Sequence, residues 1–213
     1  MSAGDLAQAE RGRICDLFLE VGPEHPTLCE GWTAADLAAH LVIRERRPDA
    51  APGILLGGRV QAYSEKIRRR IRDHGTFADL VARVRSGPPF PLRLVDGAMN
   101  LSELFIHLED VRRGAGDHTP RSEAEVGEVE AALWAIQGRR TRFLTRGLQD
   151  IDLTLALPDG ETKHIGGGSR PVTLRGRSGE LTLFLSGRRA AADVELTGET
   201  EAVDEVRTGK LGL

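Results

Sequence analysis

The chain has 213 residues, of which 29% are charged, and its formal net charge is −3. A charge so close to balance gives no general attraction to nucleic acid, and no apolar stretch approaches the roughly 18 residues that a membrane-spanning helix needs. The N-terminus lacks a basic start followed by an apolar signal core, so we expect a cytoplasmic location and neither nucleic acid nor a membrane as partner.

The N-terminal part of the chain is predicted to be helical. Residues 4–21 have the apolar spacing of an amphipathic helix, which a Gly-Pro pair ends. Thr33 is a good N-cap for a second helix, because Asp36 follows three residues later and completes a capping box. Prolines and glycines at 48–58 predict a loop. Further helices are predicted at 59–73, 76–86, 96–113 and 122–147.

The sequence pattern changes near residue 150, where short runs of alternating apolar residues replace the helical periodicity. Such alternation, with glycine turns between the runs, is typical of strands. Strands are predicted at 152–157, 171–175, 180–185 and 192–197, followed by a helix at 199–208. We therefore predict an α+β protein, with a helical N-terminal domain at 1–149 and a small α+β domain at 150–213.

Three residues on two predicted helices form a candidate metal site. Glu103 and His107 are four residues apart, which places them on the same helix face. His40 lies on another helix among leucines and alanines, and its burial would require a polar partner. Two imidazoles and a carboxylate, with a coordination position left open, are typical of a catalytic metal. The alternative is that the histidines are packed residues and that Glu103 and His107 form an ordinary helix pair.

Further polar residues near these helices have two interpretations each. Asp110 follows His107 by three residues and either accepts a hydrogen bond from that imidazole or pairs with a nearby arginine, Arg113 or Arg44. Cys15 lies within an amphipathic pattern and is expected in the core. Cys29 precedes the helix that begins near Thr33. We expect a free thiol there, outside the metal site, with an approach to the site as the less favoured alternative.

Two motifs resemble those of a known family. The segment 29–41, CEGWTAADLAAHL, resembles the first ligand motif of the mycothiol-dependent maleylpyruvate isomerases, which belong to the DinB-like metal-binding proteins. The segment 103–113, ELFIHLEDVRR, resembles their second ligand motif, and 172–198 is similar to their small C-terminal domain. The run at 103–113 is also similar to an actinobacterial subgroup described only as metal-binding proteins.

The resemblance implies a DinB-like four-helix bundle with a small C-terminal α/β domain. It also implies that His40, Glu103 and His107 bind a divalent metal, with zinc as the first expectation and nickel, cobalt, iron or manganese as alternatives. The implied cosubstrate is the low-molecular-weight thiol mycothiol, and Arg44 and Arg188 are predicted to bind an anionic group of the substrate or thiol. A homodimer is a further expectation.

Three functions remain open at this point. The first is a mycothiol-dependent S-transferase or isomerase, in which a metal-activated thiol attacks a small-molecule electrophile. The second is a metal-dependent hydrolase, which would need no added thiol. The third is a non-catalytic metal- or ligand-binding stress-response module. All three use the same ligands, so the sequence leaves enzymatic activity undecided.

Overall fold

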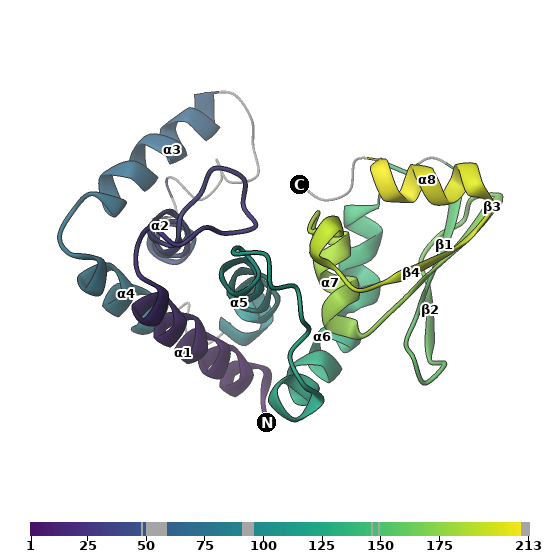
Figure 1. Cartoon of the computed structure of the whole chain (residues 1–213), viewed down its shortest axis with the longest axis horizontal. Helices are drawn as coiled ribbons and strands as arrows, with labels where there is room; N and C mark the ends of the chain where they lie inside the picture. Colours follow the sequence, from purple (N-terminus) through teal and green to yellow (C-terminus); the bar gives the residue numbers. More distant parts are fainter. Residues whose placement is uncertain (48, 50–58, 91–95, 146, 149, 210–213) are drawn as a thin grey trace. The chain divides into compact units, whose positions relative to one another are not determined.

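The computed structural model describes residues 1–47, 49, 59–90, 96–145, 147–148 and 150–209. The described residues form helices and one small mixed sheet, which confirms the α+β class at this level (Figure 1). They group into two compact units, Met1–Asp117 and His118–Leu213. The loop predicted at 48–58 lies, apart from Asp49, outside the described residues. None of the described helices combines the length and apolar character needed to cross a bilayer.

The first unit is helical, as predicted. Its helices begin where capping boxes satisfy the free N–H groups of the first turn, with Thr33 and Asp36 starting α2 and Thr76 and Asp79 starting α4. The helices of this unit are α1 (Ala3–Val21), α2 (Ala34–Arg46), α3 (Arg59–Arg72), α4 (Phe77–Arg85) and α5 (Asp96–Arg112).

Helix α2 lies at the centre of the first unit. It contacts α3 and α4, while α1 packs against α4 and α5. Most of α2 is buried, including Leu37 and Leu41, so a polar side chain on this helix must find its partners inside the protein. The approach of α1 to α5 is close, because a Cβ on Gly97 would lie 2.4 Å from the backbone of Ala3. The packing thus fixes α2 and α5, which carry the predicted ligands.

The second unit joins a long helix to a four-stranded sheet. The strand order is β2-β1-β3-β4, with β1 and β3 parallel and both outer pairs antiparallel. Trp134 packs into the same core as the inward residues of the sheet. The elements are α6 (Glu123–Leu144), β1 (Ile151–Ala156), β2 (Thr162–His164), β3 (Arg170–Arg175), α7 (Ser178–Leu185), a 3₁₀ turn (Arg189–Ala191), β4 (Glu195–Gly198) and α8 (Thr200–Thr208).

The strand predicted at 180–185 is wrong, because these residues form most of helix α7. The leucines alternate at 181, 183 and 185, but every residue of α7 is buried, so the alternation does not distinguish an inner from an outer face. A short apolar run of this kind fits a buried helix as well as a strand. Glu180, in the first turn of α7, accepts a hydrogen bond from the Asp193 N–H at 2.9 Å, which connects the helix to the segment before β4.

Helix α6 falls in the second compact unit. The sequence placed it in the N-terminal domain, with the boundary at 149/150, whereas the contacts divide the chain between Asp117 and His118. The physical reason is that α6 packs on α7 and contributes Trp134 to the sheet's core. The domains 1–149 and 150–213 remain a prediction about which segments fold independently.

Candidate metal centre

Helix α5 orients three polar side chains around one another. The Nδ1 of His107 lies 2.9 Å from the Oδ2 of Asp110, and the Nε2 of the same imidazole lies 3.8 Å from the Oε2 of Glu103. An ionised carboxylate can only accept, so Nδ1 is the donor to Asp110. The other ring nitrogen, Nε2, lies on the side of Glu103. Asp110 therefore makes the imidazole contact that was one of its two predicted roles.

Helix α2 brings the third predicted residue beside this group. The imidazole of His40 is 5.0 Å from that of His107 between ring centroids, at an interplanar angle of 76°. Both histidines are buried, at 7% and 6% exposure. The structure therefore brings His40 of α2 together with Glu103 and His107 of α5, although His40 and Glu103 are more than sixty positions apart in the sequence.

One atom of this group lacks a hydrogen-bond partner. The Nε2 of His107 is buried and accepts no hydrogen bond from any described residue, and Glu103 is too far away to bond it directly. Leaving a buried polar atom unsatisfied costs about 1–3 kcal/mol. A divalent cation bound by Nε2 would remove this cost, and the carboxylate of Glu103 and the imidazole of His40 are ligand types that zinc accepts. The residues present therefore fit a metal.

The predicted anion-binding arginines have different surroundings. Arg44 is on α2, where its Nη1 lies 3.4 Å from the Oε2 of Glu103 and its Nε donates to Asn100 at 3.3 Å. Arg188 belongs to the second compact unit and donates to the carbonyl of Ser186 at 2.7 Å. Arg44 is thus beside the candidate centre, and the role of Arg188 stays a prediction.

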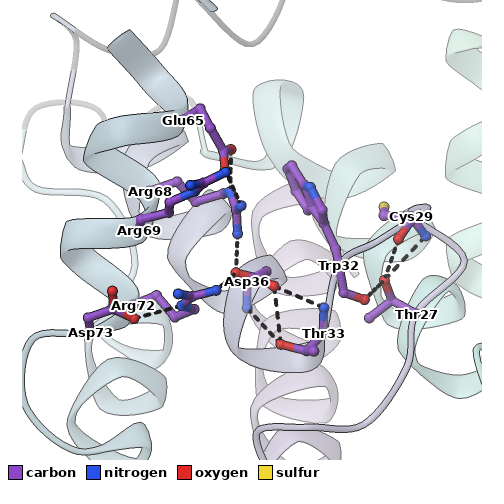
Figure 2. Close-up of polar contacts among 10 residues, drawn as sticks. All are labelled: Thr27, Cys29, Trp32, Thr33, Asp36, Glu65, Arg68, Arg69, Arg72 and Asp73. Carbon is purple, nitrogen blue, oxygen red and sulfur yellow. Dashed lines mark hydrogen bonds and ion pairs between the residues drawn. The ribbon is translucent and has the colours of Figure 1, made fainter. Parts of the chain in front are cut away.

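The loop before α2 is attached to the C-terminal end of α5. The N–H of Leu28 donates to the carbonyl of Asp110 at 3.0 Å, and a Cβ on Gly114 would lie 2.1 Å from the carbonyl oxygen of Pro26. Thr27 organises the loop itself, because its hydroxyl donates to the Trp32 carbonyl and accepts from the N–H of Cys29. Figure 2 shows the hydrogen bonds of Thr27 with Trp32 and with Cys29.

This loop delivers a residue that the sequence interpretation left outside the site. The Sγ of Cys29 lies 3.2 Å from Oδ2 of Asp110, the same oxygen that accepts from His107. These three side chains form a second group with ligand-type atoms, all within 4.8 Å of one another. No periodicity links Cys29 to Asp110, which is 81 positions away, so the only sequence signal was its place at the start of the first motif.

The same loop places an aromatic ring against the other histidine. Trp32 lies 5.2 Å from the His40 imidazole, and the guanidinium of Arg68 lies 4.7 Å from the centroid of the Trp32 ring. Arg68 is held in turn by Asp36 and Glu65, as Figure 2 shows. A cation over an indole face is a favourable arrangement. Arg68 thus contacts Trp32, and Trp32 contacts His40, so a series of side-chain contacts connects α3 to the candidate centre.

Asp36 connects Arg68 to the start of α2. Its carboxylate accepts from the N–H of Thr33 at 3.1 Å and pairs with Arg68 and Arg72. Burial acts to raise the pKa of Asp36, but the hydrogen bond from Thr33 and the two guanidinium groups outweigh it and hold the pKa below its ordinary value of 3.8. Asp36 is therefore ionised at neutral pH and fixes the turn that precedes His40.

The comparisons with known proteins support the fold. No protein-family model and no functionally curated protein matches the sequence. A solved structure with a similar fold is the crystal structure of the mycothiol-dependent maleylpyruvate isomerase, at a TM-score of 0.56 and 16% sequence identity. The match covers 93% of this chain and 92% of that chain. At this identity the comparison establishes a shared fold and leaves the chemistry to be argued from the residues.

Proposed function

We propose that the chain binds a divalent metal through His40, Glu103 and His107, within a DinB-like four-helix bundle. The observation that carries this proposal is the buried, unsatisfied Nε2 of His107, which lies on the side of the ring that faces Glu103. Its other nitrogen is bonded to Asp110, the arrangement by which carboxylates orient metal-binding imidazoles. Zinc is the first candidate, ahead of nickel, cobalt, iron and manganese.

A second ligand set, Cys29, His107 and Asp110, is less favoured. It would use the Nδ1 of His107, which donates to Asp110, and it would require the Cys29 thiol to lose the proton that it shares with the same carboxylate. It would also leave Nε2 unsatisfied. The set with His40 and Glu103 requires no existing hydrogen bond to break at His107, so it accounts for more of the observed geometry.

The proposed activity is that of a mycothiol-dependent S-transferase or isomerase. When bound, the metal would favour the thiolate form of a coordinated thiol. Neutral His40 and His107 with one Glu103 carboxylate leave a divalent site with a net positive charge, which attracts an anionic thiolate. Asp110 would keep the His107 imidazole in place, and Arg44, which lies beside Glu103, would hold an anionic group of the thiol or the substrate; anion binding by Arg188 remains a separate prediction.

The thiol would act on a small-molecule electrophile. Attack of the sulfur on carbon with loss of a leaving group gives a thioether conjugate. Addition to an activated alkene, rotation about the resulting single bond and elimination of the same thiol gives cis–trans isomerisation and regenerates the thiol. Support comes from the likeness of the fold to the mycothiol-dependent isomerase together with the donor set, while the cytoplasmic location and the homodimer remain predictions.

The first experiment is the metal content of the purified protein by elemental mass spectrometry. We expect close to one divalent metal per chain, lost in His40→Ala and in His107→Ala and retained in His74→Ala, which removes an exposed histidine. Metal retained in His107→Ala would contradict the ligand assignment. A wild-type protein without metal, even after reconstitution with zinc, would contradict the proposed function.

Turnover assays then separate the remaining alternatives. Conversion of an electrophile only with added thiol supports the transferase or isomerase. Turnover without thiol would favour the metal-dependent hydrolase, and stoichiometric ligand binding without turnover would favour the non-catalytic module.

A further inference from the structure

The Asp110 carboxylate receives two side-chain donors on one oxygen. Its Oδ2 accepts from Cys29 Sγ at 3.2 Å and from His107 Nδ1 at 2.9 Å, and the residue is fully buried. The terminal torsion of an aspartate side chain is broad, so the direction of a buried carboxylate is decided by its donors. The Cys29 and His107 donors therefore share one acceptor oxygen, and loss of the Cys29 donor removes one of the contacts that orient this oxygen for His107.

Backbone contacts hold Cys29 in place for this bond. Leu28, its neighbour, is hydrogen-bonded to the Asp110 carbonyl, and the N–H of Cys29 donates to the Thr27 hydroxyl (Figure 2). The close approach of Pro26 to Gly114 attaches the same loop to the end of α5. The backbone of Cys29 is consequently fixed by the loop, and from this position its thiol reaches Asp110.

We propose that Cys29 is a positioning residue that orients Asp110 by donating its S–H proton to Oδ2. Asp110 then holds the His107 ring with Nδ1 as donor and the Nε2 lone pair on the side of Glu103. In this role the cysteine is a protonated hydrogen-bond donor and neither a metal ligand nor a nucleophile. The inference deepens the proposed function, because its consequence for metal binding rests on His107 as a ligand.

The hydrogen-bond part is tested without metal, by NMR of metal-free protein labelled with ¹⁵N-histidine. The ring signals of His107 are identified by their absence from the spectrum of His107→Gln. We expect wild type to show a slowly exchanging Nδ1–H proton, held by the Asp110 carboxylate. Cys29→Ser keeps a donor of similar size and should retain this pattern. In Cys29→Ala the Nδ1–H proton of His107 should exchange faster with water, because the Asp110 carboxylate is less restrained. An unchanged His107 pattern in Cys29→Ala would overturn the proposal.

The metal part is tested by zinc affinity in competition with a chromophoric chelator. Loss of an outer partner of a metal ligand typically weakens binding about 10–100-fold, and Cys29 is one step further out, so we expect about tenfold weaker binding in Cys29→Ala. Cys29→Ser should recover most of the affinity. Cys15→Ala, which removes the other thiol in the core, should bind zinc as wild type does. Equal weakening in the alanine and serine variants would indicate packing alone and would overturn the proposal.

Cobalt substitution separates a donor from a ligand. The cobalt form should lack an intense cysteine-to-cobalt charge-transfer band, because no thiolate is coordinated. Such a band, lost in Cys29→Ser, would overturn the proposal and favour the ligand set of Cys29, His107 and Asp110. If wild-type protein binds no zinc while the NMR differences between the variants persist, the proposed function fails and the role of Cys29 in orienting Asp110 stands.

Discussion

Replacement of Asp36 tests how the start of α2 is fixed one turn before His40. The Asp36 carboxylate is 3% exposed and bonds Thr33, Arg68 and Arg72 (Figure 2). Breaking a buried ion pair by removing one partner costs about 3–5 kcal/mol. Arg68 keeps Glu65 as a partner, so we expect Asp36→Ala to lower the free energy of unfolding by about 2–4 kcal/mol.

The matched control is Asp79→Ala. Asp79 makes the same capping box with Thr76 at the start of α4, but it lies on the surface and forms no ion pair with an arginine of the described residues. Urea unfolding followed by circular dichroism would compare both variants with wild type at neutral pH. We expect Asp36→Ala to lower the free energy of unfolding clearly more than Asp79→Ala does. Equal losses would refute the reasoning, because they would show that the cap alone accounts for the effect of Asp36.

The same comparison has a defined pH dependence. The pKa of Asp36 is lower in the folded protein than its ordinary value, so its contribution is complete above about pH 5 and is lost as the pH falls through the folded-state pKa. The stability difference between wild type and Asp36→Ala should therefore narrow below about pH 4. A stability difference that stays constant as the pH falls below about 4 would show that the carboxylate charge is not what stabilises this turn.

Two further predictions concern the loop and the thiols. Gly114→Ala should lower the free energy of unfolding by about 1–3 kcal/mol, because the added Cβ would lie 2.1 Å from the Pro26 carbonyl oxygen. Gly12→Ala on α1, where the added Cβ meets open space, should raise the free energy of unfolding by about 0.5–1 kcal/mol. Urea unfolding measures both changes. Burial raises the pKa of the Cys15 thiol to about 11. A disulfide reagent at pH ~8 should therefore modify Cys29 in the native protein and reach Cys15 only after denaturation. Rapid modification of Cys15 in the native protein would contradict this prediction.

The helices were predictable because their signals are local. Thr33 with Asp36 marks the first turn of α2, and apolar residues three and four apart mark the faces of α1 and α5. The same local rule put Glu103 and His107 on one side of a helix. For α7 the local signal was ambiguous, since alternating leucines in a fully buried segment satisfy either a helix or a strand.

Contacts between segments far apart in sequence were harder to predict. That His40 lies beside His107 was a hypothesis from residue type and expected burial, which the family resemblance then favoured, because nothing in α2 alone distinguishes a packed histidine from a ligand. The compact units divide before α6 because Trp134 packs on the sheet, a contact that the helical pattern of α6 does not encode. Strand β2, only three residues long, has too little sequence for an alternation to be read.

The loop between α1 and α2 shows why ligand identity and ligand orientation differ in predictability. The proposed ligands lie on helices, where spacing gives the common face of Glu103 and His107. Orientation depends here on Cys29 against Asp110 and on Trp32 against His40, both supplied by a segment without regular structure. Its conformation is set by bonds from Thr27 and by backbone contacts to α5, which become apparent only in the folded chain. A substitution in this loop can therefore alter the candidate centre while every predicted ligand remains in place.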